Sequence, residues 1–315
     1  MELIMLQHPH EFNRFDFPAL SMALGYFDGV HLGHQKVILT AKKIAEEQKL
    51  ISSVMTFDPH PSVVLGRKNN PEYITPLKDK IERISQLQID YLFVVHFTSD
   101  FANLLPQEFV DQYLIGLHVE HVVAGFDFTY GRMGKGNMET LPFHSRNQFQ
   151  YTTVPKLSCE NEKISSTLIK SQIKEGKMEN MPQLLGDYFV TSGIVVHGDK
   201  RGRTIGFPTA NVEISEETII PPLGVYAVRI LVENRWYIGV CNVGYKPTFH
   251  KERLNKPSIE VHICDFDGDI YGYEATIEWH KYLRTEKKFS GIEELVAQIK
   301  EDTANTIKYF EKNKG

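Results

Sequence analysis

The sequence has few cysteines and no long apolar run, and these two shortages exclude several classes of protein. Cys159, Cys241 and Cys264 lie far apart and form no CxxC pair, which argues against a zinc site or a disulfide framework. So few thiols suit a reducing cytosol. No stretch approaches the roughly 18 consecutive apolar residues of a membrane-spanning helix. The apolar start, residues 1–6, is too short for a signal peptide. We therefore expect a soluble cytoplasmic protein that does not bind a membrane.

The sequence also lacks a large excess of either charge. It has 35 Lys and Arg against 40 Asp and Glu, a formal net charge of -5. This balance provides no global attraction to nucleic acid or to an acidic membrane surface. Basic and aromatic residues do not interleave as nucleic-acid binding would require, so no nucleic-acid partner is expected. The 42% of hydrophobic and 24% of charged residues are typical of globular domains.

The length of 315 residues fits two globular domains. In the first half, short apolar runs typical of buried strands alternate with stretches of helical periodicity. Strands are expected over 21–26, 52–57, 91–97 and 121–126, and helices over 35–48, 76–87 and 106–117. Strands that alternate with helices predict a parallel sheet, here a doubly wound α/β domain. Ligands of such sheets bind in the loops beyond the carboxyl ends of the strands.

The second half is rich in strands and turns. Two helical stretches, 167–176 and 178–185, precede it, and strands are expected over 188–196, 224–232, 236–243, 258–266 and 273–279. Asp267-Gly268 predicts a hairpin between the last two strands. The pattern favours an antiparallel barrel. A final helix over 292–311 would pack the apolar stripe Ile292, Leu295, Val296 and Ile299 on the barrel. The domains are predicted as 1–185 and 186–315.

A run of glycines and histidines, Gly25 to His34 (GYFDGVHLGH), follows the first strong strand and opens a helix. His31 and His34 are three residues apart and share one face of the first helical turn. Gly29 and Gly33 allow a sharp turn that exposes backbone N–H groups to a ligand. Those groups and the helix dipole form a phosphate site, where two imidazoles could stabilise a phosphoryl group during transfer. The alternative is an ordinary helix cap with Asp28 as the capping residue.

Three further segments stand at strand ends or helix starts. Residues 56–61 (TFDPHP) end the second strand, 125–131 (GFDFTYG) end the fourth, and 164–170 (ISSTLIK) open a helix. Singly, they could be a stiff loop or an N-cap. HxGH in this setting resembles the nucleotidyltransferase superfamily, and the whole GYFDGVHLGH string resembles the FAD synthetase module. The four segments occur in the order found in that family, so the first domain is expected to be a Rossmann-like α/β nucleotidyltransferase.

The resemblance implies roles for individual residues. Catalytic roles fall on His31 and His34. Nucleotide and phosphate contacts are expected from Gly25, Phe27, Asp28, Gly33, Asp127, Ser165, Ser166, Thr167 and Lys170. Flavin contacts are expected from Phe57, Pro59, His60, Pro61, Phe128 and Tyr130. Two positions depart from the family pattern. Tyr130 stands where Phe is common and keeps the aromatic face. Lys170 stands where Arg is common and keeps the charge but not the bidentate fork.

A second glycine-rich, basic segment runs from Gly198 to Asn211 and contains no Walker GxxxxGK[ST] pattern. Its glycines expose backbone donors, and its basic side chains could hold phosphates. Thr209 and Asn211 offer neutral oxygens that suit Mg²⁺ shared with ATP. The alternative is a basic surface hairpin. The string GRTIGFPTAN resembles the riboflavin kinase signature, as do residues 222–226, 242–249 and 258–262.

This second resemblance also assigns residues. It implies phosphate contacts from Gly198, Lys200, Arg203, Gly206 and Pro208, and metal and ATP binding by Thr209 and Asn211. It makes Glu260 the group that activates the riboflavin 5′-hydroxyl, a role that needs a carboxylate within about 2.6–3.2 Å of the alcohol. The alternative for Glu260 is a solvated strand position, since Ile259 and Val261 face the other way. Arg284 is expected to reach the flavin.

The segments that carry these resemblances span residues 22 to 289, and together they resemble those of the bifunctional riboflavin kinase/FAD synthetases. They imply ATP-dependent phosphorylation of riboflavin to FMN, then adenylylation of FMN to FAD with release of pyrophosphate, with Mg²⁺ as cofactor. The partners expected are small molecules, and self-association is not readable from the sequence. Three alternatives remain at this point. One activity could be lost while its domain only binds flavin, the chain could be a non-catalytic flavin-binding regulator, or HxGH could serve another substrate such as pantetheine phosphate or glycerol phosphate.

Overall fold

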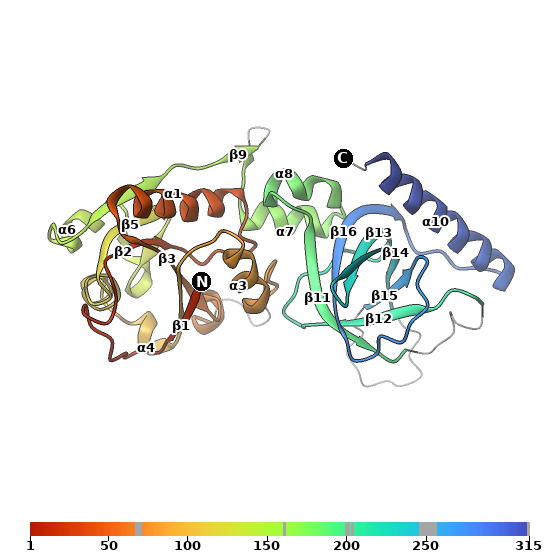
Figure 1. Ribbon diagram of the computed structural model, residues 1–315, viewed down its shortest axis with the longest axis horizontal. Coiled ribbons are helices and arrows are strands. Elements are labelled where there is room, and N and C mark those ends of the chain that lie inside the picture. The colour runs from red at the N-terminus through yellow and green to blue at the C-terminus, as the bar shows by residue number, and fades with distance from the viewer. Residues whose placement is uncertain (67–70, 160–161, 199–201, 203–204, 246–256, 314–315) are drawn as a thin grey trace. The chain divides into compact units, whose positions relative to one another are not determined.

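The computed structural model describes residues 1–66, 71–159, 162–198, 202, 205–245 and 257–313. Contacts divide the chain into two compact units, Met1–Ser166 and Thr167–Gly315 (Figure 1). The division falls before the domain limit expected at residue 185. The boundary falls earlier because residues 167–185 pack with the second unit. That stretch holds α7 (Ser166–Lys174), η3 (Met178–Asn180) and α8 (Met181–Leu185).

The first unit is built on a parallel sheet of six strands in the order β1-β4-β3-β2-β5-β8. The strands are β1 (Glu2–Leu6), β2 (Leu20–Leu24), β3 (Ile51–Asp58), β4 (Tyr91–His96), β5 (Val119–Gly125) and β8 (Gln150–Val154). The expected α/β domain and its four central strands are confirmed. The sequence pattern did not reveal β1 and β8, because both are half-exposed edge strands without a continuous apolar run.

Helices cover both faces of this sheet, as the alternation of strand side chains requires. On β2, Met22 and Leu24 join one apolar core and Ala23 joins the other. The first core is closed by α4 (Ser99–Ala102), α5 (Pro106–Phe109) and the π-helix η1 (Val110–Ile115). The second is closed by α1 (Leu32–Gln48) and α3 (Leu77–Ser85) (Figure 1). The single helix expected over 106–117 is therefore α5 followed by a π-helix.

The strand order reverses at β2, and this reversal predicts where a ligand binds. From β2 the chain moves to β3 and β4 on one side, and β5 then returns to the other side of β2. The crevice beyond the carboxyl ends of β2 and β5 is the usual ligand site of a doubly wound sheet. Short elements follow the carboxyl ends of β3, β5 and β8: α2 (Pro61–Val64) after β3; β6 (Thr129–Tyr130), η2 (Arg132–Gly134), β7 (Gly136–Asn137) and α6 (Leu141–Ser145) after β5; and β9 (Ser158–Cys159) and β10 (Glu162–Lys163) after β8.

The second unit is a closed antiparallel barrel in the order β11-β12-β15-β14-β13-β16, as expected. Its strands are β11 (Phe189–Val196), β12 (Thr209–Ile214), β13 (Gly224–Val232), β14 (Arg235–Gly244), β15 (Ser258–Ile263) and β16 (Glu274–Arg284). The predicted hairpin at Asp267-Gly268 is wrong, because β15 pairs with β12 and β14 while β16 pairs with β11 and β13. Positive φ along this connection falls at Asp265 and Gly272 instead.

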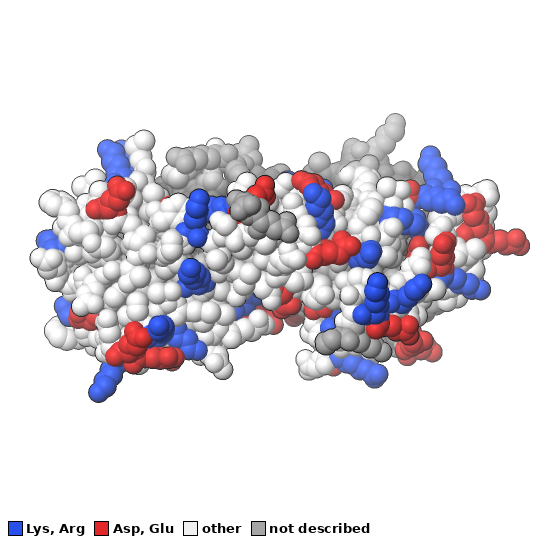
Figure 2. Space-filling view, turned by 90° about the horizontal axis from the view of Figure 1, so that it is seen from above, with Lys and Arg blue, Asp and Glu red and all other residues white. Residues whose placement is uncertain are grey.

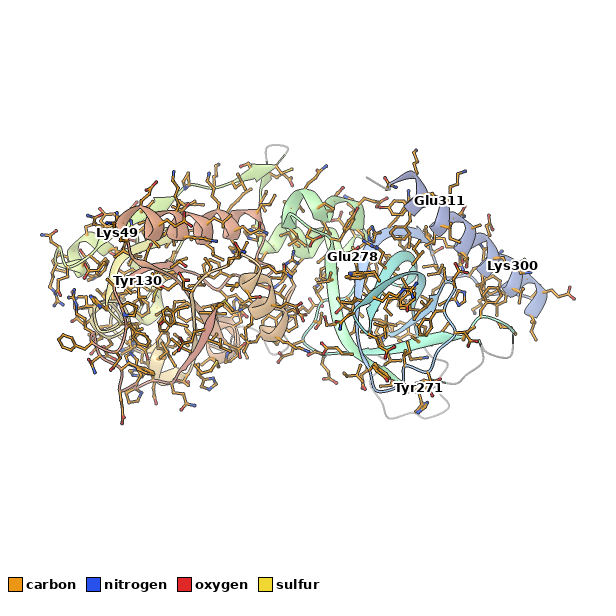
Figure 3. The ribbon with its side chains drawn as sticks, in the orientation of Figure 1. Lys49, Tyr130, Tyr271, Glu278, Lys300 and Glu311 are labelled. Atoms are coloured by element: carbon orange, nitrogen blue, oxygen red, sulfur yellow. The ribbon has the colours of Figure 1, made fainter. Side chains whose placement is uncertain are left out.

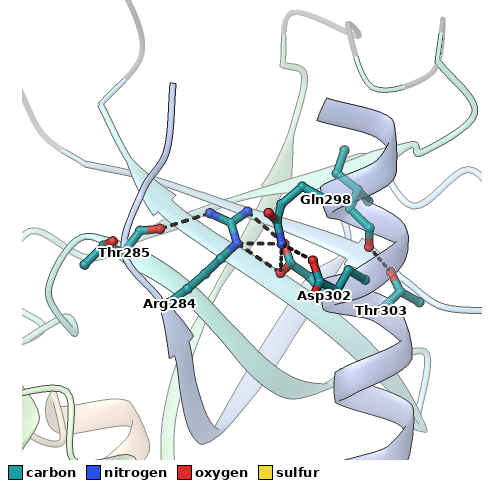
Figure 4. A network of polar contacts seen from close by, with 7 residues as sticks. Arg284, Thr285, Gln298, Asp302 and Thr303 are labelled. Carbon is teal, nitrogen blue, oxygen red and sulfur yellow. Dashed lines mark hydrogen bonds and ion pairs between the residues drawn. The ribbon is translucent and has the colours of Figure 1, made fainter. Parts of the chain in front are cut away.

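The expected last helix is confirmed as α10 (Ile292–Lys312), but its expected apolar stripe is not fully buried. Ile292 is 65% exposed, whereas the buried residues of α10 are Asp302 and Thr306. The guanidinium of Arg284 on β16 donates from Nε and Nη2 to the Asp302 carboxylate, at 2.8–3.1 Å (Figure 4). A buried ion pair therefore fastens α10 to the barrel.

The surface carries both signs of charge. On the face shown in Figure 2, Lys and Arg side chains are interspersed with Asp and Glu, without a large field of one sign. Within the described ranges, no helix combines the length and the apolar character needed to cross a bilayer.

Candidate active sites

The loop between β2 and α1 is folded sharply by backbone conformations that side chains rarely adopt. Phe27, Gly29 and Val30 have φ values of 58°, 85° and 42°, all in the left-handed region. A Cβ at Gly25 would lie 2.5 Å from the Phe27 ring, so only glycine fits beneath it. The loop therefore turns the chain from the buried end of β2 directly into the start of α1.

His31 and His34 meet at the first turn of α1. His31 is the N-cap residue, and its Nδ1 accepts a hydrogen bond of 3.2 Å from the His34 backbone N–H. The two rings stack with centroids 3.5 Å apart. Because Nδ1 of a neutral His31 is the acceptor, its proton is carried by Nε2. Within the described part of the chain, the buried Nδ1 of His34 has no hydrogen-bond partner.

Both imidazoles are neutral near pH 7. Burial lowers the pKa of His31 to about 4. Burial, with smaller contributions from His31, Lys80 and Lys163, lowers the pKa of His34 well below its ordinary value. A neutral imidazole still donates one N–H. The pair therefore offers fixed hydrogen-bond donors at the start of a helix without adding positive charge.

Asp28 fastens this loop to the segment before α3. Its Oδ1 accepts from the backbone N–H groups of Ile74 and Thr75, at 2.9 and 3.1 Å, and Gly29 N–H donates to Thr75 Oγ1 at 2.8 Å. The alternative in which Asp28 caps the helix is wrong, because His31 is the cap. The contact expected between Asp28 and the nucleotide stays a prediction.

The structure brings the third and fourth segments to the same place. Ser166 Oγ donates 2.9 Å to the backbone oxygen of Asp28, and Ile164 O lies 3.9 Å from the Cβ position of Gly33. Asp127 forms an ion pair with Lys163, and both charges act on His31. Ser165 lies between Ile164 and Ser166, whereas Thr167 and Lys170 follow on α7 in the second unit. Nucleotide contacts of these residues stay predictions.

An aromatic cavity of about 250 Å³ lies beyond the ends of β3 and β4. It is lined by Phe57, Pro61, Leu65, Phe97, Phe101, Ala102, Leu104, Phe109, Thr129, Tyr130, Gly131, Met133 and Gly134. Three of the expected flavin residues, Phe57, Pro61 and Tyr130, therefore share one cavity. Sequence reasoning missed Phe97, Phe101 and Phe109, because they come from the next strand and from helices packed below it.

The other expected flavin residues lie outside this lining. His60 caps α2, accepts from Ser62 N–H at 2.9 Å, and has its ring 4.2 Å from the Tyr26 ring. Pro59 precedes it, and the Phe128 ring stacks beside Tyr130 with centroids 6.2 Å apart. The hydroxyl of Tyr130 lies 2.8 Å from His144 Nδ1 (Tyr130 is labelled in Figure 3). The departure from Phe to Tyr is thus accommodated by a hydrogen bond.

In the barrel unit, two cavities of about 310 Å³ each meet at β12. The one we call the β12 cavity is lined by Val195, Gly198, Gly202, Pro208, Thr209, Ala210, Asn211, Ile263, Phe266, Asp267, Gly268, Ile270 and Tyr271. The one we call the α10 cavity is lined by Gly202, Ile205, Phe207, Thr209, Val225, Val240, Asn242, Glu260, His262, Arg284, Glu286, Lys287, Phe289, Leu295, Ile299 and Asp302. Gly202 and Thr209 line both, so the cavities adjoin.

Glu260 stands at this junction. In the register of the barrel, Glu260 on β15 pairs with Asn211 on β12 and with Asn242 on β14. Ile259 and Val261 are buried on the opposite side, as expected. The outward side chain of Glu260 nevertheless lines the α10 cavity instead of lying free in solvent, and Ser258 Oγ donates to it at 3.3 Å. A carboxylate in the α10 cavity thus adjoins an amide of the β12 cavity.

The residues at the junction fit a hard cation. The Oδ1 atom of Asn211 is buried and, among the described residues, has no hydrogen-bond partner. A Cβ at Gly198 would overlap the Asn211 amide, so the glycine leaves the room that this side chain occupies. Neutral oxygens are ligands that Mg²⁺ accepts together with substrate phosphates. The described residues contain no cluster of three His, Cys, Asp or Glu that could hold a metal without such a substrate.

The remaining predicted residues of the barrel unit divide into three groups. Gly206 has φ 84° and open space around it, and Pro208 O accepts a hydrogen bond of 2.9 Å from His262 Nδ1. Lys200 and Arg203 lie outside the described residues. Arg284 lines the α10 cavity, but its guanidinium donates to Asp302 and to Thr285 O. Arg284 therefore positions α10, and its contact with flavin stays a prediction.

Sequence reasoning also missed an aromatic wall of the β12 cavity. Tyr271, which precedes β16, lies with its ring 3.8 Å from that of His197, after β11 (Tyr271 is labelled in Figure 3). Phe266 lines the same cavity. Tyr271 lies in the connection interpreted as a hairpin, and Phe266 was expected inside the strand 258–266, whereas β15 ends at Ile263.

Comparison with known proteins matches each unit to a family. Residues 16–168 match the model of the FAD synthetase family, and residues 185–310 match that of the riboflavin kinase family. A bifunctional riboflavin kinase/FMN adenylyltransferase of Bacillus subtilis is 53% identical over 98% of this chain and 98% of its own. One of Listeria monocytogenes is 49% identical over 99% of each. A solved structure from Streptococcus pneumoniae, described as a macrolide-efflux protein, is 34% identical with a TM-score of 0.84, covering 96% of this chain and 98% of its own.

These matches cover both units, so the alternatives with one activity, with no catalysis or with another substrate are not supported. Riboflavin, FMN, FAD and ATP are the substrates and products that the family handles. The chain belongs to the family of bifunctional riboflavin kinase/FMN adenylyltransferases.

Proposed function

We propose that the junction of the β12 and α10 cavities is the riboflavin kinase site. ATP would occupy the β12 cavity, with its phosphates directed toward Thr209, and riboflavin would occupy the α10 cavity with its 5′-hydroxyl near Glu260. The observation that supports this arrangement is the register that pairs Glu260 with Asn211 across adjacent strands. It would place a proton acceptor for the alcohol beside the phosphates of the donor nucleotide.

In this step, the oxygen of the riboflavin 5′-hydroxyl bonds to the γ-phosphorus of ATP, and the Glu260 carboxylate accepts the hydroxyl proton. The bond from that phosphorus to the β-phosphate oxygen breaks, which gives FMN and ADP. Thr209 and Asn211 would hold Mg²⁺ through their side-chain oxygens. When bound there, Mg²⁺ neutralises charge on the phosphates of ATP. The buried, unpartnered Oδ1 of Asn211, among the described residues, supports this assignment.

The loop between β2 and α1 is the proposed site of adenylyl transfer. A phosphate oxygen of FMN attacks the α-phosphorus of a second ATP, and the bond to pyrophosphate breaks. His31 and His34 donate N–H groups to oxygens of the transferring group, and the aromatic cavity with Phe57 and Tyr130 would hold the isoalloxazine ring. No covalent intermediate is needed, since FMN is the nucleophile. Preorganised donors of this kind contribute about 10²–10³ in rate each.

Supplying each substrate separately tests these assignments. With ATP and either riboflavin or FMN, chromatography separates FMN formation from FAD formation. His31→Ala should abolish FAD formation and leave FMN formation intact. Glu260→Gln should abolish FMN formation while supplied FMN is still converted. If either change removed both products from a folded chain, the two-site assignment would be wrong.

Matched variants control for the loss of any histidine or carboxylate. His118→Asn changes a histidine that precedes β5, at the opposite end of the sheet from the loop. Glu213→Gln neutralises an exposed carboxylate on β12. Both controls should retain both activities. We also propose that both reactions take place in the cytoplasm, the compartment expected from the sequence.

A further inference from the structure

A fully buried lysine lies next to the adenylyl-transfer loop, and no step above uses it. Lys80 on α3 is 1% exposed. Lysine is almost never buried to this extent without an electrostatic reason, because removing its charge from water is costly. Its position therefore needs an explanation.

The surroundings of Lys80 belong to both halves of the transfer site. Its Nζ lies 3.9 Å from the centroid of the Tyr26 ring, in the loop that leads to His31 and His34. The Tyr26 ring in turn lies 4.2 Å from the ring of His60, in the segment after β3. The Lys80 charge also acts on His34 and on Asp58, the last residue of β3. Lys80 is thus buried between the histidine pair and the segment expected to face the flavin.

The chemistry of the step calls for positive charge at this place. An FMN phosphate must approach the triphosphate of ATP, and both are anions. The two histidines are neutral, so they add no positive charge of their own. A buried ammonium is poorly screened, so its field acts more strongly on a nearby phosphate than that of an exposed lysine.

We propose that Lys80 is a positioning residue for FMN adenylylation: its buried ammonium holds Tyr26 and the His34 side of the loop in place and offsets negative charge where the FMN phosphate meets the α-phosphoryl group. The inference rests on the proposed location of adenylyl transfer at His31 and His34. It assigns Lys80 no direct contact with the reacting atoms.

The test uses the full-length chain with Lys80→Met and Lys80→Gln, two uncharged variants that pack differently. FAD formation from FMN should fall about 10²-fold or more in kcat, with the KM for ATP changed less than about threefold, as expected for a loss of transition-state stabilisation. FMN formation in the second unit should stay within about twofold and serves as an internal control. Lys78→Met, which removes an exposed charge two residues away on α3, should leave both activities unchanged.

Two further measurements separate electrostatics from packing. Removing the ammonium should raise the pKa of His34, followed by NMR titration of labelled histidines, because Lys80 is one of the charges that lower it. Lys80→Arg should have a kcat for FAD formation at least about tenfold above that of the uncharged variants, since it restores the charge.

Each outcome decides the proposal. A folded Lys80→Met or Lys80→Gln variant that keeps kcat for FAD formation within about threefold would overturn it, as would equal loss of FMN formation. Loss of cooperative unfolding in both uncharged variants would make Lys80 a structural residue and would also overturn it. His31→Ala, assayed alongside, keeps the two hypotheses distinct. FAD formation that survives without His31 contradicts the proposed site, whereas dependence on His31 but not on Lys80 contradicts only the role of Lys80.

Discussion

The stacked histidines show how burial sets the chemistry of a donor pair. His31 is 5% exposed, so its ring is held neutral by desolvation and directed by the backbone N–H of His34. A neutral N–H donor does not bind a phosphate as tightly as an imidazolium would. It can still stabilise the negative charge that develops on the oxygens of the transferring phosphoryl group, provided its geometry is fixed beforehand. The N-cap position and the stacking supply that fixed geometry.

The low pKa of His31 also predicts a pH dependence of stability. The unfolded histidine binds a proton below pH 6.5, whereas the folded one does so only near pH 4. The stabilisation is therefore complete above pH 6.5 and is lost as pH falls toward 4, by on the order of 3 kcal/mol. Hydrogen exchange of α1 amides at pH 7 and pH 5, corrected for intrinsic rates, measures it. In His31→Asn, which keeps a capping side chain without titrating, the difference should shrink; an unchanged difference would contradict the assignment.

Tyr130→Phe tests the hydroxyl that departs from the family pattern. The variant removes the 2.8 Å contact with His144 but keeps the ring in the aromatic cavity. We expect a loss of about 1 kcal/mol in stability, typical of one hydrogen bond, with FAD formation retained. Thermal unfolding with and without FMN measures the stability and the FMN affinity, and the FAD assay measures the activity. A large drop in FMN affinity would show that the hydroxyl itself binds flavin.

At the residue scale, the site residues that the sequence predicted belong to contiguous motifs. The HxGH run and the segment ending in Thr209 and Asn211 are such cases, because backbone turn and side chain come from the same stretch. Lys80 and Tyr271 were missed for the opposite reason. Each reaches its site from an element distant in sequence, and a lone lysine or tyrosine in an amphipathic or turn-rich stretch carries no local signal.

At the scale of elements, α10 forms one wall of the proposed kinase site as well as packing on the barrel. Leu295 and Ile299 line the α10 cavity together with Glu260. Arg284 and Asp302 hold that wall in place (Figure 4). At the other end of α10, the Phe310 ring lies 4.6 Å from that of His280, whose Nε2 lies 2.6 Å from Glu278 (Glu278 is labelled in Figure 3). Polar anchors thus add to the half-buried part of the expected apolar stripe, Leu295, Val296 and Ile299, whereas Ile292 is exposed.

Breaking the anchor should weaken riboflavin binding. In Asp302→Ala, Arg284 keeps its charge in a partly buried position without its carboxylate, which typically costs about 3–5 kcal/mol when a buried pair loses one partner. The KM for riboflavin should rise, while FAD formation from supplied FMN is unchanged. Flavin fluorescence titration reports the affinity. Glu301→Ala, an exposed neighbour on α10, is the control. Unchanged riboflavin affinity in Asp302→Ala would show that α10 does not depend on this pair.

The elements that sequence reasoning missed or misplaced have local patterns that do not reflect their pairing in the sheet. Central strands of the first sheet carry continuous apolar runs, and these were found. The edge strands β1 and β8 lack such runs. The strand β12 begins at Thr209, inside a segment whose glycines and basic residues are typical of a loop. The Asp267-Gly268 pair is a local turn signal, but barrel closure pairs β15 and β16 with other strands. Long-range pairing overrode the local pattern.

At the scale of the whole molecule, the two units carry distinct chemistries with separate residue sets. The residues proposed for FMN formation, Thr209, Asn211 and Glu260, all lie in the barrel unit. His31, His34 and Lys80 all lie in the first unit. These two sets share no residue, although Thr167 and Lys170, which are expected to contact the nucleotide of the first site, lie in the second unit. FMN made at one site can therefore be used at the other after passing through solution.

A mixing experiment tests this independence. His31→Ala alone should convert riboflavin to FMN and stop there, and Glu260→Gln alone should make neither product from riboflavin. An equimolar mixture of the two should make FAD from riboflavin and ATP, because the first chain supplies FMN to the second. FAD should appear after a lag that lengthens on dilution, since FMN must accumulate in solution first. A mixture that makes FMN but no FAD, although Glu260→Gln converts added FMN, would mean that FMN does not leave the chain that makes it.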